Sequence, residues 1–116
     1  MLHILLHIAL PLGVAIIFYR SRWLWPFAIM LTGMLIDLDH LLADPIYDPA
    51  RCSVGFHPLH TLLPIAGYTA LLFFKKTRLI GIGLCIHIVL DSIDCRLNTG
   101  LWFFAPVTSN ALIFLS

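Results

Sequence analysis

The feature that most constrains the fold is a series of apolar segments, each about as long as one membrane crossing. They cover approximately residues 2–19, 23–42, 58–74 and 79–95, and short loops with charged or turn-forming residues separate them. A helix needs about 20 predominantly apolar residues to cross the hydrocarbon core of a bilayer. We therefore predict an all-α membrane protein that forms a bundle of four transmembrane helices.

A further apolar stretch, residues 101–115, is shorter and is interrupted by Pro106, Ser109 and Asn110. It fits a short C-terminal re-entrant, interfacial or fifth helix, and these alternatives stay open. The composition agrees with the membrane assignment, because 60% of the residues are hydrophobic and only 11% are charged. A chain of 116 residues has room for one such unit, so we expect a single integral membrane domain over residues 1–116.

The basic residues predict which way the bundle faces. Five of the seven Lys and Arg residues occupy two short loops, at residues 20–22 and 75–78. The positive-inside rule places such loops in the cytoplasm. The N-terminus, the loop at residues 44–55 and the end of the fourth segment then lie on the outer side. The net charge of +1 and the lack of a basic stripe with interleaved aromatics exclude nucleic acid as a partner.

Aspartate and histidine residues collect on the predicted outer side. The second apolar segment ends with Asp37, Asp39 and His40. Charged side chains are costly inside a membrane, so they normally line a cavity, pair with one another or bind an ion. On an α-helix Asp37 and His40 share a face, whereas Asp39 points elsewhere unless the helix frays after Ile36. A single Asp-x-x-His is weak evidence for a metal site. Its weight depends on whether other segments supply further ligands at the same depth in the membrane.

The next segments supply those partners at helical spacing. Two His residues are three apart at the start of the third segment, and a His and two Asp residues form a stripe on the fourth. Helix bundles build carboxylate and imidazole metal sites from inward-facing pairs of this kind. The predicted metal ligands are Asp37, His40, His57, His60, His87, Asp91 and Asp94. Seven ligands exceed the needs of one tetrahedral ion, so two ions are plausible.

The donor set also predicts which metals would bind. Mixed nitrogen and oxygen donors suit Zn, Mn or Fe better than Ca. We expect one or two divalent metal ions, with Zn favoured and Mn or Fe as alternatives. Taken singly, each residue also fits a cap, an ion pair or a buried neutral histidine. The prediction of a metal site depends on their convergence at one depth.

Other polar residues on the outer side have several readings. His3 and His7, one helical turn apart, are additional candidate ligands. Asp39 is the candidate catalytic residue, as a general base, and it also fits a bridging ligand or a partner that orients an imidazole. Arg51 and Arg96 are candidates for binding an anionic headgroup, and snorkelling to the interface explains them equally.

The three cysteines carry less information. Cys52 in the outer loop and Cys95 near the end of the fourth segment are placed to form a disulfide in an oxidising compartment. Cys85 lies within the membrane segment and fits a small apolar core residue. Because no Cys-x-x-Cys pair occurs, a thiolate zinc site is not expected.

Ordered motifs also carry a resemblance to a known family. They are Asp37-Leu-Asp39-His40, His57-Pro-Leu-His60-Thr61, His87-Ile-Val-Leu-Asp91 and residues 99–109. Their order and spacing resemble bacterial inner-membrane proteins described as LexA-regulated, metal-dependent hydrolases. A similar family of short membrane proteins of unknown function fits this length better. The resemblance implies a bacterial inner-membrane location and the same metal ligands. With the orientation given by the positive-inside rule, the N-terminus and the site would face the periplasm.

Together these features predict a membrane-embedded metal-dependent hydrolase. A metal-activated water would cleave a lipid or a lipid-linked ester or phosphoester. The alternatives are a non-catalytic metal-binding or metal-transport membrane protein, and a structural subunit in which the ion staples short helices. The expected partners are membrane lipids and a lipid substrate, and the sequence is compatible with an oligomer.

Overall fold

The computed structural model describes residues 2–42 and 52–103, with side chains from residue 4 onward. The described chain is all-helical. Its elements are α1 (Leu2–Phe18), η1 (Arg20–Arg22), α2 (Leu24–Leu31), η2 (Thr32–Leu42), η3 (Pro58–His60), α3 (Leu62–Leu71) and α4 (Arg78–Thr99), where η marks a 3₁₀ helix. Of the predicted C-terminal segment, residues 101–103 are described and are not helical. Residues 104–115, Arg51 and the side chain of His3 lie outside the described residues.

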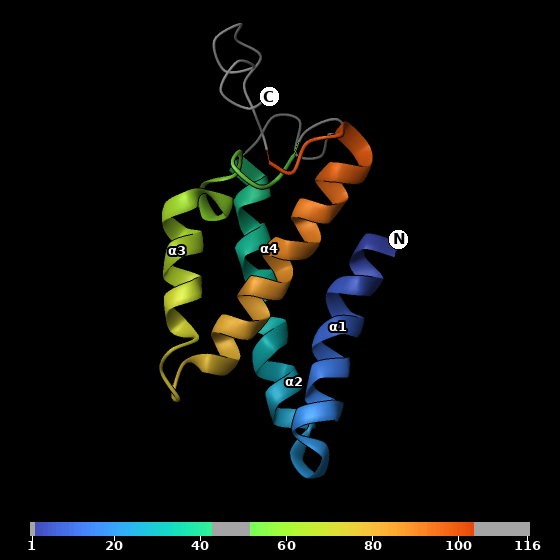
Figure 1. Ribbon diagram of the computed structural model, residues 1–116, viewed down its shortest axis with the longest axis vertical. Coiled ribbons are helices and arrows are strands. Elements are labelled where there is room, and N and C mark those ends of the chain that lie inside the picture. Colours follow the sequence, from blue (N-terminus) through green and yellow to red (C-terminus); the bar gives the residue numbers. More distant parts are fainter. Residues whose placement is uncertain (1, 43–51, 104–116) are drawn as a thin grey trace, which may run out of the picture.

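The helices form a bundle in which α4 is the common partner. It packs against α1, α2 and α3, and η2 packs against α4 and η3 (Figure 1). A small buried core between these elements consists of Ile36, Val54, Leu84 and Ile88. This arrangement brings the end of η2, the turn at η3 and the second half of α4 together.

Within the described residues, one helix is long and apolar enough to cross a membrane. It covers Leu24–Leu42 and combines α2 with η2. The apolar helices Ile4–Phe18 and Leu62–Leu71 are shorter. The 22-residue helix α4 begins with Arg78 and carries Asp91, Asp94 and Arg96 in its second half. The all-helical architecture is therefore confirmed, whereas four transmembrane crossings stay a prediction.

The second predicted helix changes its geometry halfway. Residues after Leu31 continue as the eleven-residue 3₁₀ helix η2, which has three residues per turn and therefore three faces. One face is buried and contains Gly33, Ile36 and Asp39. The next contains Asp37 and His40, which are half-buried. The third face is exposed and consists of Leu35, Leu38 and Leu41, at 62%, 62% and 64%. Asp39 thus points into the protein beside Asp37, not away from it.

The third helix is shorter than predicted from the sequence. Instead of one helix over residues 58–74, a turn of 3₁₀ helix is followed by an extended residue, Thr61 (φ −89°, ψ 170°), before α3 begins. His57 is also extended, with ψ 143°, as expected for a residue that precedes proline. The break turns His57 and His60 into the protein. At the other end, the Thr77 hydroxyl donates to the Leu71 carbonyl at 2.9 Å.

Two glycines allow α4 to approach α2 and η2 closely. A Cβ atom on Gly83 would lie 2.7 Å from the Cα of Met30, and one on Gly33 would lie 3.0 Å from the carbonyl carbon of Gly83. Small residues let helix backbones approach in this way. The close approach determines how near the ligands on η2 come to those on α4.

A disulfide fixes the end of the bundle that is opposite the basic loops. Cys52 and Cys95 are bonded, with Cα atoms 5.0 Å apart, and Cys85 is the free cysteine of the described chain. The bond attaches the segment that precedes η3 to the last turns of α4. The pairing expected from the sequence is therefore present.

Replacing Gly83 with alanine should loosen the contact between α2 and α4. We expect Gly83→Ala to lower the free energy of unfolding by about 1–3 kcal/mol, because the added methyl overpacks the interface. Gly67→Ala is the matched control, since nothing lies within 4 Å of its Cβ position, and alanine favours a helix by about 1 kcal/mol. Unfolding in detergent micelles, followed by circular dichroism, measures both. Equal stabilities for the two variants would contradict the close approach.

The disulfide predicts the pattern of thiol alkylation. Protein isolated without reductant, then denatured and treated with an alkylating reagent, should carry one modified cysteine, Cys85, because Cys52 and Cys95 are bonded. Prior reduction should raise the number to three, which is the cysteine content of the chain. Peptide mass spectrometry assigns each site. Modification of Cys52 or Cys95 without reduction would show that the bond is absent.

Candidate metal centre

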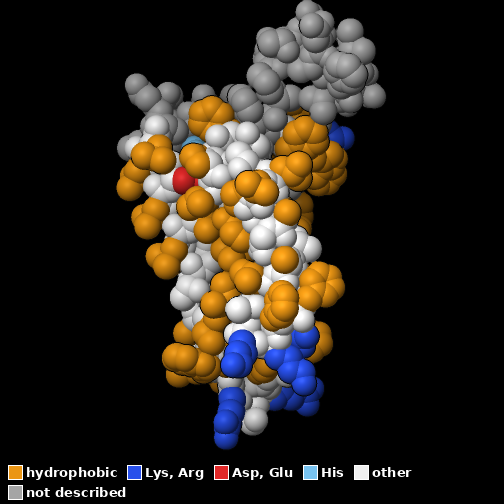
Figure 2. Space-filling model, turned by 90° about the vertical axis from the view of Figure 1, so that its left-hand side faces the viewer, with side chains coloured by type: hydrophobic (Ala, Val, Ile, Leu, Met, Phe, Trp, Pro, Cys, Tyr) orange, Lys and Arg blue, Asp and Glu red, His pale blue; other side chains and the backbone are white. Residues whose placement is uncertain are grey.

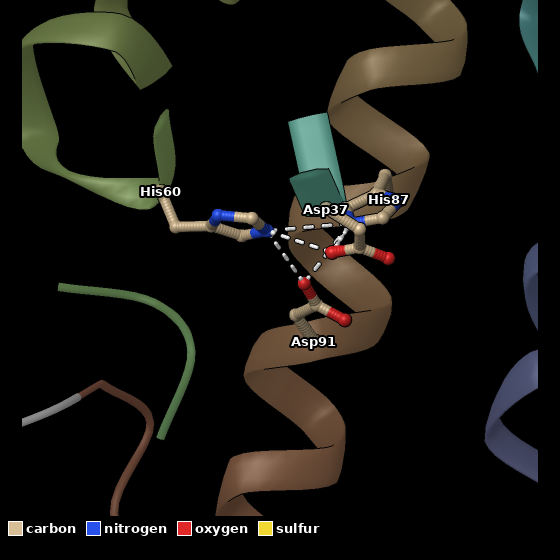
Figure 3. Close-up of side chains that lie close together, drawn as sticks. All are labelled: Asp37, His60, His87 and Asp91. Atoms are coloured by element: carbon tan, nitrogen blue, oxygen red, sulfur yellow. Dashed lines mark hydrogen bonds and ion pairs between the residues drawn. The ribbon is translucent and has the colours of Figure 1, made fainter. Parts of the chain in front are cut away.

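Four side chains from three elements converge on one point (Figure 3). Asp37 comes from η2, His60 from η3, and His87 and Asp91 from successive turns of α4. One ligand atom of each lies within 4.8 Å of the ligand atoms of the other three. We call these four residues the first cluster.

The distances within the first cluster match a tetrahedral site. Nε2 of His60 lies 3.3 Å from Asp37 Oδ1 and 3.1 Å from Asp91 Oδ2. Nε2 of His87 lies 3.0 and 3.1 Å from the same two oxygens. The two Nε2 atoms are 3.3 Å apart. Ligand atoms bonded at about 2.0–2.1 Å to a tetrahedral ion are separated by about 3.3 Å. The donor set and its dimensions therefore fit a divalent ion such as Zn²⁺.

Asp39 determines which nitrogen of His60 faces the cluster. Its Oδ2 accepts a hydrogen bond from Nδ1 of His60 at 2.9 Å and another from the backbone N–H of Leu59 at 2.8 Å. A neutral imidazole that donates through Nδ1 has an unprotonated Nε2. The lone pair of His60 Nε2 is thus directed at the other ligands. A carboxylate behind a ligating imidazole is the common supporting arrangement in metal sites.

Burial makes the charged groups of the first cluster costly to desolvate. His60, His87 and Asp91 are almost fully buried, whereas the side chain of Asp37 is 35% exposed. Two carboxylates in so small a space disfavour each other's charged form. A bound divalent cation would neutralise both and would compensate their desolvation. The exposed edge of Asp37 makes the cluster reachable from outside the bundle.

His7 supports the cluster from α1. Its Nε2 lies 3.1 Å from Asp91 Oδ1, the oxygen that does not face His60 and His87. The ring of His7 also packs edge-on against that of His87, with centroids 4.5 Å apart. His7 was an additional candidate ligand, and the structure places it behind Asp91. It therefore holds a ligand in position.

A second group of potential ligands adjoins the first. Asp39, His40 and His57 each offer a ligand atom within 4.8 Å of the others. We call these three residues the second cluster. The rings of His40 and His57 lie against each other, with centroids 3.8 Å apart and planes tilted by 31°. Nε2 of His40 lies 3.2 Å from the Ser53 hydroxyl. The single ligand set expected from the sequence is therefore divided into two clusters.

The remaining predicted residues lie elsewhere. Asp94 is half-buried and belongs to neither cluster. Arg96 is exposed, donates to the carbonyl of Gly100, and lies 5.9 Å from the centre of the Trp102 ring. Among the described residues, Arg96 is the only cation near this end of the bundle, and its role in headgroup binding stays a prediction.

The two ends of the bundle differ in charge. Figure 2 shows Lys and Arg side chains gathered at one end, while acidic and histidine atoms reach the surface toward the other end among hydrophobic side chains. The basic end contains η1 and the turn between α3 and α4. The predicted separation of the basic loops from the Asp and His residues is thus seen in the fold.

Two contributors to the site were missed in the sequence. Ser53 contacts His40 from a turn-rich loop, and the backbone N–H of Leu59 holds Asp39. A backbone donor has no side-chain signature. Ser53 is one of several small polar loop residues and no spacing distinguishes it. Neither could be found from the pattern of residues alone.

The comparisons with known proteins identify a family but no activity. A family model described as a family of unknown function, DUF6122, matches residues 1–98. That range contains both clusters. No curated protein and no solved structure matches the chain. The resemblance to LexA-regulated hydrolases is not tested by these matches and stays a prediction.

Proposed function

The chain belongs to DUF6122, a family of unknown function, and from its site we propose that it is a membrane-embedded metal-dependent hydrolase. Its substrate would be a lipid or a lipid-linked ester or phosphoester. The observation that carries the proposal is the first cluster, in which two imidazole nitrogens and two carboxylate oxygens lie 3.0–3.3 Å from their neighbours across the set. This donor set suits Zn, with Mn or Fe as alternatives.

The surface supports a membrane location for the whole bundle. Large hydrophobic side chains are exposed on every α-helix, and Leu62 and Leu63 on α3 reach 82% and 84%. Soluble monomers rarely expose apolar surface on this scale. We propose that α1, α3 and α4 lie in the bilayer beside the membrane-length helix Leu24–Leu42. The basic end would face the cytoplasm of a bacterial cell and the clusters would face the periplasm.

The chain's own residues would divide the catalytic work. A bound metal ion lowers the pKa of a coordinated water and polarises a carbonyl or phosphoryl oxygen. His60, His87 and Asp91 are buried and would fix the ion, while Asp39 and His7 hold His60 and Asp91 in place. Asp37 is the exposed carboxylate of the cluster, and we assign it the proton from the attacking water. Asp39, the candidate base from the sequence, uses Oδ2 to orient His60.

The surroundings of Asp37 favour an amphiphilic substrate. Its neighbours on the exposed face of η2, Leu35 and Leu38, are each 62% exposed, and Leu59 beside His60 is 40% exposed. An acyl chain would contact these side chains while its polar ester reached Asp37. A lipid diffusing in the outer leaflet meets both conditions.

Hydrolysis requires that His60, His87 and Asp91 hold the ion and that water or substrate takes the fourth tetrahedral position, beside the half-exposed Asp37. Structural metal sites are closed by protein ligands, whereas catalytic sites keep a position open for water or substrate. A non-catalytic metal-binding or transport role is the alternative. Metal binding without turnover of any lipid ester would favour that alternative.

Neutralising one ligand should abolish hydrolysis. We expect Asp91→Asn to lower the turnover of a fluorogenic lipid phosphoester or carboxylic ester by at least about 100-fold, because the charge of a buried ligand is lost. Asp94→Asn is the matched control. It lies on the same helix, outside both clusters, and should keep activity within about two-fold. Assays use Zn²⁺-loaded or Mn²⁺-loaded protein in mixed micelles.

The comparison with Asp94→Asn also tests whether Asp91, and not Asp94, is a metal ligand on α4. Equal losses in Asp91→Asn and Asp94→Asn would contradict the assignment of the first cluster. Zinc-loaded wild type that hydrolyses no lipid ester or phosphoester would contradict the proposed function itself.

A further inference from the structure

We infer that the second cluster, Asp39, His40 and His57, is a second divalent-cation site beside the first. The inference deepens the proposed function and rests on it, because two adjoining ions would act on one substrate. The ligand class is the same, a transition-metal dication. The second cluster consists of different residues from the first, contains one carboxylate instead of two, and is held in place by different contacts.

The donors of the second cluster are held by two adjoining segments. Asp39 and His40 lie on neighbouring faces of η2, and His57 lies just before η3. Asp39 and His57 are 4% and 2% exposed. A cluster of one carboxylate and two imidazoles supplies three ligands, which leaves a position open at a tetrahedral ion.

One buried carboxylate oxygen of the second cluster is suited to bind a cation. Oδ1 of Asp39 is fully buried and accepts no hydrogen bond from the described residues, although Nδ1 of His40 lies 3.2 Å away. The other oxygen of the same carboxylate accepts two hydrogen bonds. Leaving a buried carboxylate oxygen without a partner costs free energy. A cation bound at Oδ1 removes that cost.

Two carboxylates connect the clusters. Oδ1 of Asp37 lies 3.0 Å from Nε2 of His87 in the first cluster and 3.5 Å from Nδ1 of His40 in the second. Asp39 contributes Oδ1 to the second cluster and supports His60 of the first through Oδ2. Hydrolytic sites for two metals hold their ions about 3.5–4 Å apart, so ligands from two such ions must adjoin in this way.

The charges predict that the second ion binds more weakly than the first. The first cluster contains two carboxylates and the second contains one, so its attraction for a dication is smaller. Its loop is nevertheless fixed, because Cys52 is bonded to Cys95 and Ser53 contacts His40. We therefore expect two binding steps of different affinity.

The test is the number of ions bound per chain. Metal-free full-length protein in detergent is titrated with Zn²⁺, freed of unbound metal by gel filtration, and analysed by elemental mass spectrometry. Wild type should bind two ions. His57→Ala and His40→Gln should each bind one, because the second cluster loses a ligand. Asp94→Asn is the control that should retain two. The expression tag carries no histidine.

The outcomes separate this inference from the proposed function. Wild type that binds one ion, or a His57→Ala chain that still binds two, would overturn the second site. If His57→Ala fails to fold, His40→Gln decides, and two ions in that variant would overturn the inference. One ion with lipid hydrolysis contradicts the second site alone. Two ions without hydrolysis of any lipid ester contradicts the proposed function alone.

Discussion

The burial of carboxylates among apolar helices is the constraint on which the rest of this structure depends. Asp39 and Asp91 are almost fully enclosed, and an uncompensated charge at that depth would be prohibitive. Each is matched by imidazoles, and the hydrogen bond from His60 to Asp39 aligns one of them. The close approach at Gly83 and the break at Thr61 are the local features that bring η2, η3 and α4 within reach of one another.

The sequence predicted which residues form the site better than it predicted how they are arranged in space. Apolar segments gave the helices, and the depth of the Asp and His residues predicted that they would meet. The positions of Asp37, His60, His87 and Asp91 are those expected of ligands. What periodicity could not supply was the change from 3.6 to 3.0 residues per turn in η2, because no residue type specifies a 3₁₀ helix. That change turns Asp39 inward.

Two further differences have similar physical origins. The helix predicted from residue 58 begins later, because Pro58 restricts His57 to extended backbone and Thr61 is also extended. The stripe on α4 was expected to contribute His87 and Asp91 as ligands, with Asp94 as a further ligand or bridge. Among the described residues, His87 and Asp91 belong to the first cluster and Asp94 belongs to neither cluster. Such contacts depend on tertiary packing, which spacing along one helix does not encode.

The buried ligand set and the exposed apolar surface together are the basis for proposing hydrolysis of a lipid ester. A reachable carboxylate, Asp37, lies at the edge of a buried ligand set and beside exposed leucines. A soluble substrate would not require that combination, whereas an ester at the membrane surface would meet a polar site and an apolar wall at once. The basic loops at the opposite end would fix the orientation of the bundle.

X-ray absorption spectroscopy at the zinc edge tests the central claim most directly. The protein would be loaded with one equivalent of Zn²⁺, which should occupy the first cluster. Our account predicts four nitrogen or oxygen ligands at about 2.0–2.1 Å, with outer-shell scattering from two imidazoles, and loss of part of that scattering in His87→Ala. A spectrum of hydrated zinc without imidazole scattering, unchanged in His87→Ala, would contradict it.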